Sequence, residues 1–130
     1  MTSAFAEQIV KIAKKQAEPV LKVGNLEGER DFTDVRDVAR AYRLITEGGH
    51  KEKAYNISSE KFIKISGLLE ELCRLAGVRP EILVDSDRYR PLDARPRIDS
   101  SRIRKELGWK PQIKLSTTLR DVLADIERRV

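Results

Sequence analysis

Apolar residues recur at the spacing of an amphipathic helix in five segments of the chain. The clearest segment is 65–76, where isoleucine and leucine at positions 65, 68, 69, 72 and 75 fall on one helical face. Gly77 follows this segment directly, as glycine does after many helices because it tolerates a left-handed backbone. The other segments are 2–16, 34–47, a short one opening near residue 100 and a last one opening near residue 116. The pattern therefore predicts five helices.

Short polar side chains are placed where three of these helices begin. Thr33 or Asp34 can cap the helix at 34–47, Asp99 or Ser100 the short helix, and Ser116 the last one. The apolar face of the helix at 34–47 is predicted to comprise Val35, Val38, Tyr42 and Ile45.

Three short apolar runs, at 20–23, 54–58 and 81–84, have the composition of strands. Gly24 and Asn25 end the first run, because both residues turn the chain at little cost. Helices and strands alternate, so the predicted class is α/β, or mixed α+β if the chain stands alone. Three short strands make a thin sheet with unpaired edges. We therefore expect the chain to be part of something larger, or to pair with a partner.

Length and composition indicate a globular protein. The chain has 130 residues, of which 36% are charged, and we expect residues 1–130 to form a single domain. No apolar run approaches the roughly 20 residues that cross a bilayer, and the first residues lack a signal-peptide pattern, so we expect a cytoplasmic protein without a membrane partner. Cys73 cannot form an internal disulfide and is predicted to be buried. His50 is the only histidine, which excludes a histidine-based metal cluster.

The net charge of +5 permits nucleic-acid binding but gives it little support. The 26 basic residues are spread along the chain among 21 acidic ones, and interleaved aromatics for base stacking are absent. A solvated surface with one local anion site fits the sequence at least as well.

Two arginines on separate segments are candidates for that anion site. Arg30 follows the first predicted strand, and Arg90 lies in the extended basic stretch at 85–97, three residues before Asp93. Two guanidinium groups can clamp a diphosphate, and a carboxylate can accept hydrogen bonds from ribose hydroxyls. Surface pairing of Arg30 with Asp31 or Asp34 is the alternative. The nearby basic residues Arg88, Arg95 and Arg97 are equally eligible from the sequence.

Known catalytic patterns are missing from the sequence. It contains no Gly-x-Gly-x-x-Gly, no phosphate-binding Gly-x-x-x-x-Gly-Lys and no Cys-x-x-Cys. Neither Tyr42, Tyr55 nor Tyr89 is followed by lysine four residues later. We therefore assign no catalytic residue and no metal ligand.

Five stretches together resemble the C-terminal half of extended short-chain dehydrogenase/reductases, most closely GDP-mannose 4,6-dehydratases and GDP-sugar reductases. They are TSAFAEQI at 2–9, KVGNLEGERDFTDVRDV at 22–38, AYNI at 54–57, RPLD at 90–93 and LGWKP at 107–111. Their order and spacing are those of the family, and the resemblance covers essentially the whole chain. It implies the substrate-binding portion of a Rossmann-type, NAD(P)-dependent nucleotide-sugar lyase of the epimerase/dehydratase group.

The resemblance also implies roles for particular residues. Arg30 and Arg90 would contact the diphosphate of a GDP-mannose-type nucleotide sugar, and Asp93 would hold its ribose hydroxyls. Val23 and Asn25 would lie beside the base, and the loop around Arg90 would cover the bound nucleotide.

The resemblance leaves out the family's N-terminal half, which carries the glycine-rich cofactor loop and the Tyr-x-x-x-Lys pair. This chain is therefore expected to bind no cofactor and to catalyse nothing alone, and the strand at 54–57 would lack its neighbours in the cofactor domain's sheet. Ile98 also departs from the family pattern, which has glycine there. The alternative function is a stand-alone binding module without catalysis, or one that forms a homodimer through its unpaired strands.

Overall fold

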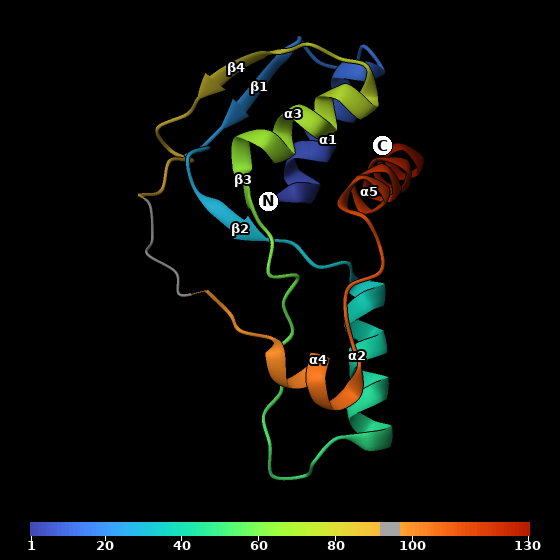
Figure 1. The fold of residues 1–130 in the computed structure, drawn as a ribbon. Helices are drawn as coiled ribbons and strands as arrows, with labels where there is room; N and C mark the ends of the chain where they lie inside the picture. The colour runs from blue at the N-terminus through green and yellow to red at the C-terminus, as the bar shows by residue number, and fades with distance from the viewer. Residues whose placement is uncertain (92–96) are drawn as a thin grey trace. The chain divides into compact units, whose positions relative to one another are not determined.

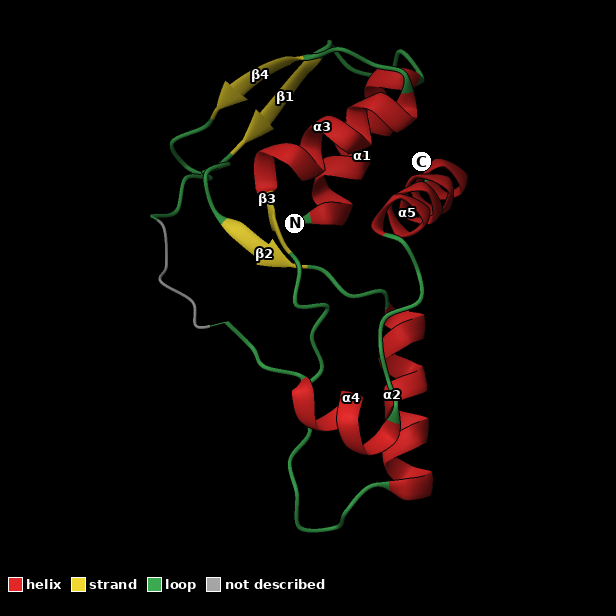
Figure 2. Cartoon of the chain, in the orientation of Figure 1, coloured by secondary structure: helices red, strands yellow, loops and turns green. Residues whose placement is uncertain are grey.

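The computed structural model describes residues 1–91 and 97–130, and this part of the chain contains five helices and four short strands (Figure 1; Figure 2). In chain order they are α1 (Thr2–Ala13), β1 (Val20–Val23), β2 (Glu29–Asp31), α2 (Val35–Gly48), β3 (Phe62–Lys64), α3 (Ile65–Ala76), β4 (Glu81–Val84), α4 (Ser101–Leu107) and α5 (Leu115–Arg129).

The described residues gather into two compact units. The first unit comprises 1–29, 64–91 and 116–130, and the second comprises 30–63 and 97–115. The strands form two two-stranded sheets, one pairing β1 with β4 and the other pairing β2 with β3. No helix in the described part of the chain is both long and apolar enough to cross a bilayer.

In the first unit, β1 and β4 run parallel, with Val20 opposite Glu81 and Val23 opposite Val84. Leu21 and Val23 are buried, whereas Lys22 between them is exposed, as expected for a strand with one covered face. Helix α1 contacts both β1 and α3. The core of this unit is built from the buried apolar residues of these elements and of α5, including Ile9, Leu21, Leu68, Leu72 and Leu119.

In the second unit, Trp109 is fully buried and forms a cluster with Ala41 of α2 and Ile103 of α4. Other apolar side chains pack around this cluster, namely Leu44, Ile45, Tyr55, Ile57 and Leu107. The indole Nε1 of Trp109 donates a hydrogen bond to the backbone oxygen of Asp37, 2.9 Å away. The second unit is therefore organised around one tryptophan.

Several predicted elements are confirmed. The strands at 20–23 and 81–84 and the helix at 65–76 have the predicted bounds. Gly77 and Gly108 end α3 and α4 with φ of +69° and +65°, a region that favours glycine. Asp34 caps α2 by accepting a hydrogen bond from the amide of Arg36, and Asp99 accepts one from the amide of Ser101 at the start of α4.

The predicted strand at 54–58 is wrong, and two strands escaped prediction. Residues 54–58 form no strand, although the side chains of Tyr55 and Ile57 pack against the Trp109 cluster. A strand exists only with a hydrogen-bonding neighbour, and this segment finds none among the described residues. Strands β2 and β3 have three residues each, too few to give a recognisable periodicity.

The apolar face predicted for α2 is also corrected. Val35 and Tyr42 are 77% and 62% exposed, whereas Asp37 and Ala41 are buried. The side of α2 that carries Asp37 and Ala41 faces inward because Asp37 accepts hydrogen bonds from the indole of Trp109 and from the amide of Ile113.

Smaller differences concern the ends of two helices and one thiol. Helix α1 ends at Ala13 rather than at residue 16, and α5 starts at Leu115, so Ser116 lies inside its first turn. The thiol of Cys73 is only partly buried, and this burial, together with the nearby charge of Glu70, raises its pKa.

Candidate functional site

The carboxyl ends of β1 and β4 lie side by side, because the two strands are parallel and Val23 is opposite Val84. The loops that leave these ends, 24–28 and 85–91, carry two of the predicted site residues, Asn25 and Arg90, and a third, Val23, ends β1. Ligands of α/β proteins commonly bind beyond the carboxyl ends of parallel strands. The predicted nucleotide site is therefore expected at this edge of the first unit.

Val23 is the last residue of β1 and is only 1% exposed. Its carbonyl oxygen accepts a hydrogen bond from the amide of Asp85, 2.8 Å away, which carries the strand pairing one step beyond β4. The side chain of Val23 is buried in the core, so only its backbone contacts the loop that follows β4.

Gly24 makes the closest approach between the two loops. A Cβ atom at this position would lie 2.3 Å from the carbonyl oxygen of Arg88, a distance that real contacts do not reach. Glycine is therefore required here because the backbone of the other loop occupies the space of a side chain.

Asn25 joins the two loops through its side-chain amide. Its Nδ2 donates to the carbonyl oxygen of Arg90 at 3.1 Å, and its Oδ1 accepts from the amide of Glu27 at 3.0 Å. Both ends of the amide are thus occupied, and the first loop holds the second at the residue predicted to contact a diphosphate.

Arg90 is exposed and lies on a turn that Asp85 organises. The carboxylate of Asp85 accepts the amide of Asp87, and its carbonyl oxygen accepts the amide of Arg88. The Nη1 of Arg90 donates to the carbonyl oxygens of Asp87 and Tyr89, at 3.3 and 3.1 Å. These contacts hold the guanidinium at the protein surface against its own turn.

The other two predicted residues are placed differently. Arg30 is the central residue of β2, is partly buried and belongs to the second unit. Asp93 lies outside the described residues. The structure thus brings together Val23, Asn25 and Arg90 within one unit.

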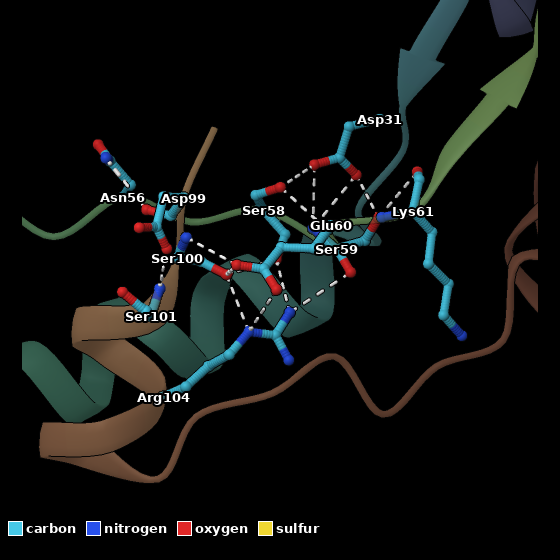
Figure 3. A network of polar contacts seen from close by, with 10 residues as sticks. All are labelled: Asp31, Asn56, Ser58, Ser59, Glu60, Lys61, Asp99, Ser100, Ser101 and Arg104. Carbon is cyan, nitrogen blue, oxygen red and sulfur yellow. Dashed lines mark hydrogen bonds and ion pairs between the residues drawn. The ribbon is translucent and has the colours of Figure 1, made fainter. Parts of the chain in front are cut away.

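Near Arg30 in the sequence, Asp31 takes part in a polar network that the sequence did not indicate (Figure 3). Its carboxylate accepts hydrogen bonds from the hydroxyls of Ser58 and Ser59 and, at 3.0 Å, from the amide of Ser59. Ser58 is fully buried. These bonds fasten the segment after residue 57 to the end of β2.

Glu60, Ser100 and Arg104 continue the network into α4 (Figure 3). The carboxylate of Glu60 accepts the amide and the hydroxyl of Ser100, both at 2.9 Å, and these bonds lower the pKa of Glu60. Arg104 donates to the hydroxyl of Ser100 and to the carbonyl oxygen of Ser58. Because its donors and acceptors satisfy one another, the network fits a structural role.

No group of three or more carboxylate, histidine or cysteine side chains within the described ranges could hold a metal ion. The only sequence signal for the polar network was its content of serines and acids, which is common on surfaces. Its partners are up to 46 residues apart in the chain, so only the fold reveals them.

Comparison with solved structures identifies the class of protein. The chain is similar to the structure of RMD from Pseudomonas aeruginosa complexed with NADPH, with a TM-score of 0.92 and 35% identity, over 100% of this chain and 43% of that one. The fold is therefore shared with extended short-chain dehydrogenase/reductases.

The sequence comparison narrows this class to a family. Residues 1–122 match the family model described as GDP-mannose 4,6 dehydratase, and the chain belongs to this family. It is 36% identical over 129 residues to GDP-6-deoxy-D-mannose reductase of Pseudomonas aeruginosa and 42% identical over 105 residues to dTDP-glucose 4,6-dehydratase of Neisseria meningitidis.

The chain spans less than half of these relatives. The alignments cover 98% of this chain but 42% of the reductase, and 70% of this chain but 29% of the dehydratase.

Proposed function

We propose that the chain is the nucleotide-sugar-binding, C-terminal portion of an NAD(P)-dependent enzyme resembling GDP-mannose 4,6-dehydratase. The observation that carries the proposal is the joining of two loops, through Asn25 and the carbonyl of Arg90, at the carboxyl ends of a parallel strand pair. The family membership supports a nucleotide diphosphate sugar of the GDP-mannose type as the ligand.

In this proposal Arg90 binds the diphosphate from the loop after β4. A guanidinium on a surface turn can exchange its two carbonyl contacts for charged phosphate oxygens, which are stronger acceptors. Arg30 is assigned to the same diphosphate, Asp93 to the ribose hydroxyls and Val23 with Asn25 to the base. These assignments rest on the family's motifs at these positions.

The turn that follows β1 does not fit the pyrophosphate of a dinucleotide cofactor. The turn that follows β1 has glycine at positions 24 and 28 with Asn25, Leu26 and Glu27 between them, which is not the Gly-x-Gly-x-x-Gly spacing. That turn leads into β2 rather than into the helix whose N-terminus would face a pyrophosphate. We therefore assign no hydride-transfer or dehydration step to this chain.

Calorimetric titration of GDP and of GDP-mannose into the purified chain tests the proposal. We expect micromolar binding, which Arg90→Ala and Arg30→Ala each weaken by about 1.5–3 kcal/mol, the usual contribution of a hydrogen bond to a charged group. Arg43→Ala is the matched control, because Arg43 is an exposed arginine of α2 whose ion-pair partner in the described part of the chain is the exposed Glu47, 3.9 Å away.

Two results would contradict the proposal. One is the absence of binding heat for both ligands from a chain that circular dichroism shows to be folded. The other is an equal loss of affinity in Arg43→Ala, which would mean that the arginines act only through net charge.

A further inference from the structure

Strand β4 forms one edge of the two-stranded sheet that it makes with β1 (Figure 1). All four of its residues are exposed, with Ile82 at 43%, Leu83 at 47% and Val84 at 58%. Natural edge strands are usually protected by charges, proline or a bulge. Pro80 precedes this strand and Glu81 opens it, but from Ile82 to Val84 it carries only apolar side chains.

The hydrogen bonds to β1 show which backbone groups β4 leaves for its other edge. The amide of Glu81 donates to the carbonyl oxygen of Pro19, and that of Asp85 donates to the carbonyl oxygen of Val23, at 2.9 and 2.8 Å. Because backbone groups alternate between the two sides of a strand, the N–H and C=O groups of Ile82 and Val84 point away from β1.

A groove lies beside this open edge. Its volume is about 350 Å³, and Ile82 of β4 lines it together with residues of α3 and of the loop between them, among them Leu69, Cys73 and Val78. Ile82 and Val84 are in register with the buried Leu21 and Val23, so they lie on the covered face of the sheet. The apolar side of α3 that carries Leu69 and Cys73 thus extends beyond β4, and one more strand beside β4 would cover it.

Charges at the two ends of β4 indicate the direction of that strand. Arg79 lies just before β4 and Glu81 is its first residue, while Asp85 and Asp87 lie just after it. An antiparallel copy with Ile82 opposite Val84 would set Arg79 of one chain opposite Asp87 of the other. It would also set Glu81 opposite Asp85, whose charge is already paired with Arg88 at 3.5 Å. A parallel, in-register copy would instead set like charges together at all of these positions.

We propose that β4 pairs antiparallel with β4 of a second copy of this chain. The pairing is two-fold symmetric and closed, and it joins two two-stranded sheets into one of four strands, which better satisfies the strand edges. The helix-covered faces of both copies lie on the same side, where the two grooves meet. This pairing of two β4 edges does not require a bound nucleotide.

Sedimentation velocity over a range of micromolar concentrations tests the proposal. We expect the wild-type chain to dimerise and Val84→Pro to weaken the dimer by at least about tenfold. Proline removes an N–H that points to the open edge, and edge strands tolerate proline at such positions. Circular dichroism checks that this variant folds. Tyr42→Lys, which removes an exposed aromatic residue from α2, is the control and should leave the dimer unchanged.

A charge exchange tests the direction of pairing without altering the backbone. Arg79→Asp and Asp87→Lys should each weaken the homodimer, while a mixture of the two variants should form a heterodimer of near wild-type affinity. A monomeric wild-type chain at submillimolar concentration would overturn the proposal and leave the strand edge to a different partner. Failure of the mixture to restore the dimer would overturn the antiparallel arrangement.

Discussion

Gly24 illustrates how one residue sets the spacing of the candidate nucleotide site. The space of its missing side chain is filled by the carbonyl of Arg88, and the next residue, Asn25, bonds to the carbonyl of Arg90. The loop after β1 therefore lies directly against the loop after β4. Any side chain at position 24 has to separate the two loops before Asn25 can reach its partner.

We predict that Gly24→Ala lowers the free energy of unfolding by about 1–3 kcal/mol, the usual cost of forcing extra atoms into a packed position. It should also speed hydrogen exchange at the amide of Asp85, which bonds to Val23 beside the contact. Urea denaturation followed by circular dichroism measures the first effect, and amide exchange by NMR measures the second.

Gly67→Ala is the matched control for this substitution. Gly67 lies in α3, and a Cβ atom there would meet nothing within 4 Å. Alanine is the better helix former by roughly 0.5–1 kcal/mol, so this variant should be more stable than wild type. Unchanged stability in Gly24→Ala would contradict the close approach of the two loops.

At the scale of single residues, the family motifs led to Asn25 and Arg90, and the structure shows that they share a hydrogen bond. Nothing in the sequence indicated that Asp31 bonds to Ser58 and Ser59, or that Glu60 bonds to Ser100. Such bonds join segments that are distant in the chain, and polar residues of these kinds are common on any surface.

At the scale of elements, Asp37 connects α2 with the segment that follows Trp109. Its buried carboxylate accepts the amides of Gln112 and Ile113 and pairs with Arg40 at 3.1 Å. Burial raises the pKa of Asp37, but the hydrogen bonds from Ile113, Arg40 and Gln112 outweigh it, so that the pKa lies below its ordinary value. The charged form therefore stabilises the second unit.

We predict that Asp37→Asn costs about 1.5–3 kcal/mol at neutral pH, because it replaces charged hydrogen bonds. The folded state holds the proton more weakly than the unfolded state, so the advantage of wild type is full above the ordinary aspartate pKa of about 4 and shrinks as the pH falls through the lower folded value. Fluorescence of Trp109 during urea denaturation reports on this unit.

Glu47→Gln makes the same change of carboxylate to amide on the exposed surface of α2. Within the described residues, Glu47 forms an exposed ion pair with Arg43 at 3.9 Å, so the effect of this substitution on stability should be below about 0.5 kcal/mol. A cost for Asp37→Asn that stays constant from pH 7 to well below pH 4 would contradict the role assigned to the charge.

The predictability of an element depended on whether its stability is local. Helix α3 could be predicted to the residue because its apolar spacing and Gly77 lie within the segment. Residues 54–58 have the composition of a strand, but their partner is not among the described residues, and composition cannot supply one. The inward face of α2 was predicted only in part: Ile45 packs against the Trp109 cluster as expected, but a buried aspartate, Asp37, also faces the core where an apolar residue was expected.

At the scale of the whole molecule, the described residues form two compact units, each with its own hydrophobic core. The chain spans 42% of a relative that is 36% identical to it. Hydrophobic periodicity was sufficient for the five helices, and apolar composition for the strands β1 and β4, but only the fold shows that these two strands pair and run parallel. The proposed ligand required the resemblance to a family, because no spacing of residues within the chain is specific for a nucleotide sugar.

The most direct test of the account is to observe where GDP binds. The experiment is a titration of ¹⁵N-labelled chain with GDP, followed by amide NMR spectra. We predict that the largest shift changes occur at residues 24–27 and 85–91, the two loops that Asn25 joins, while the amides of α5 stay in place. Saturating shifts confined to other segments, or none from a folded chain, would contradict a nucleotide site at the carboxyl ends of β1 and β4.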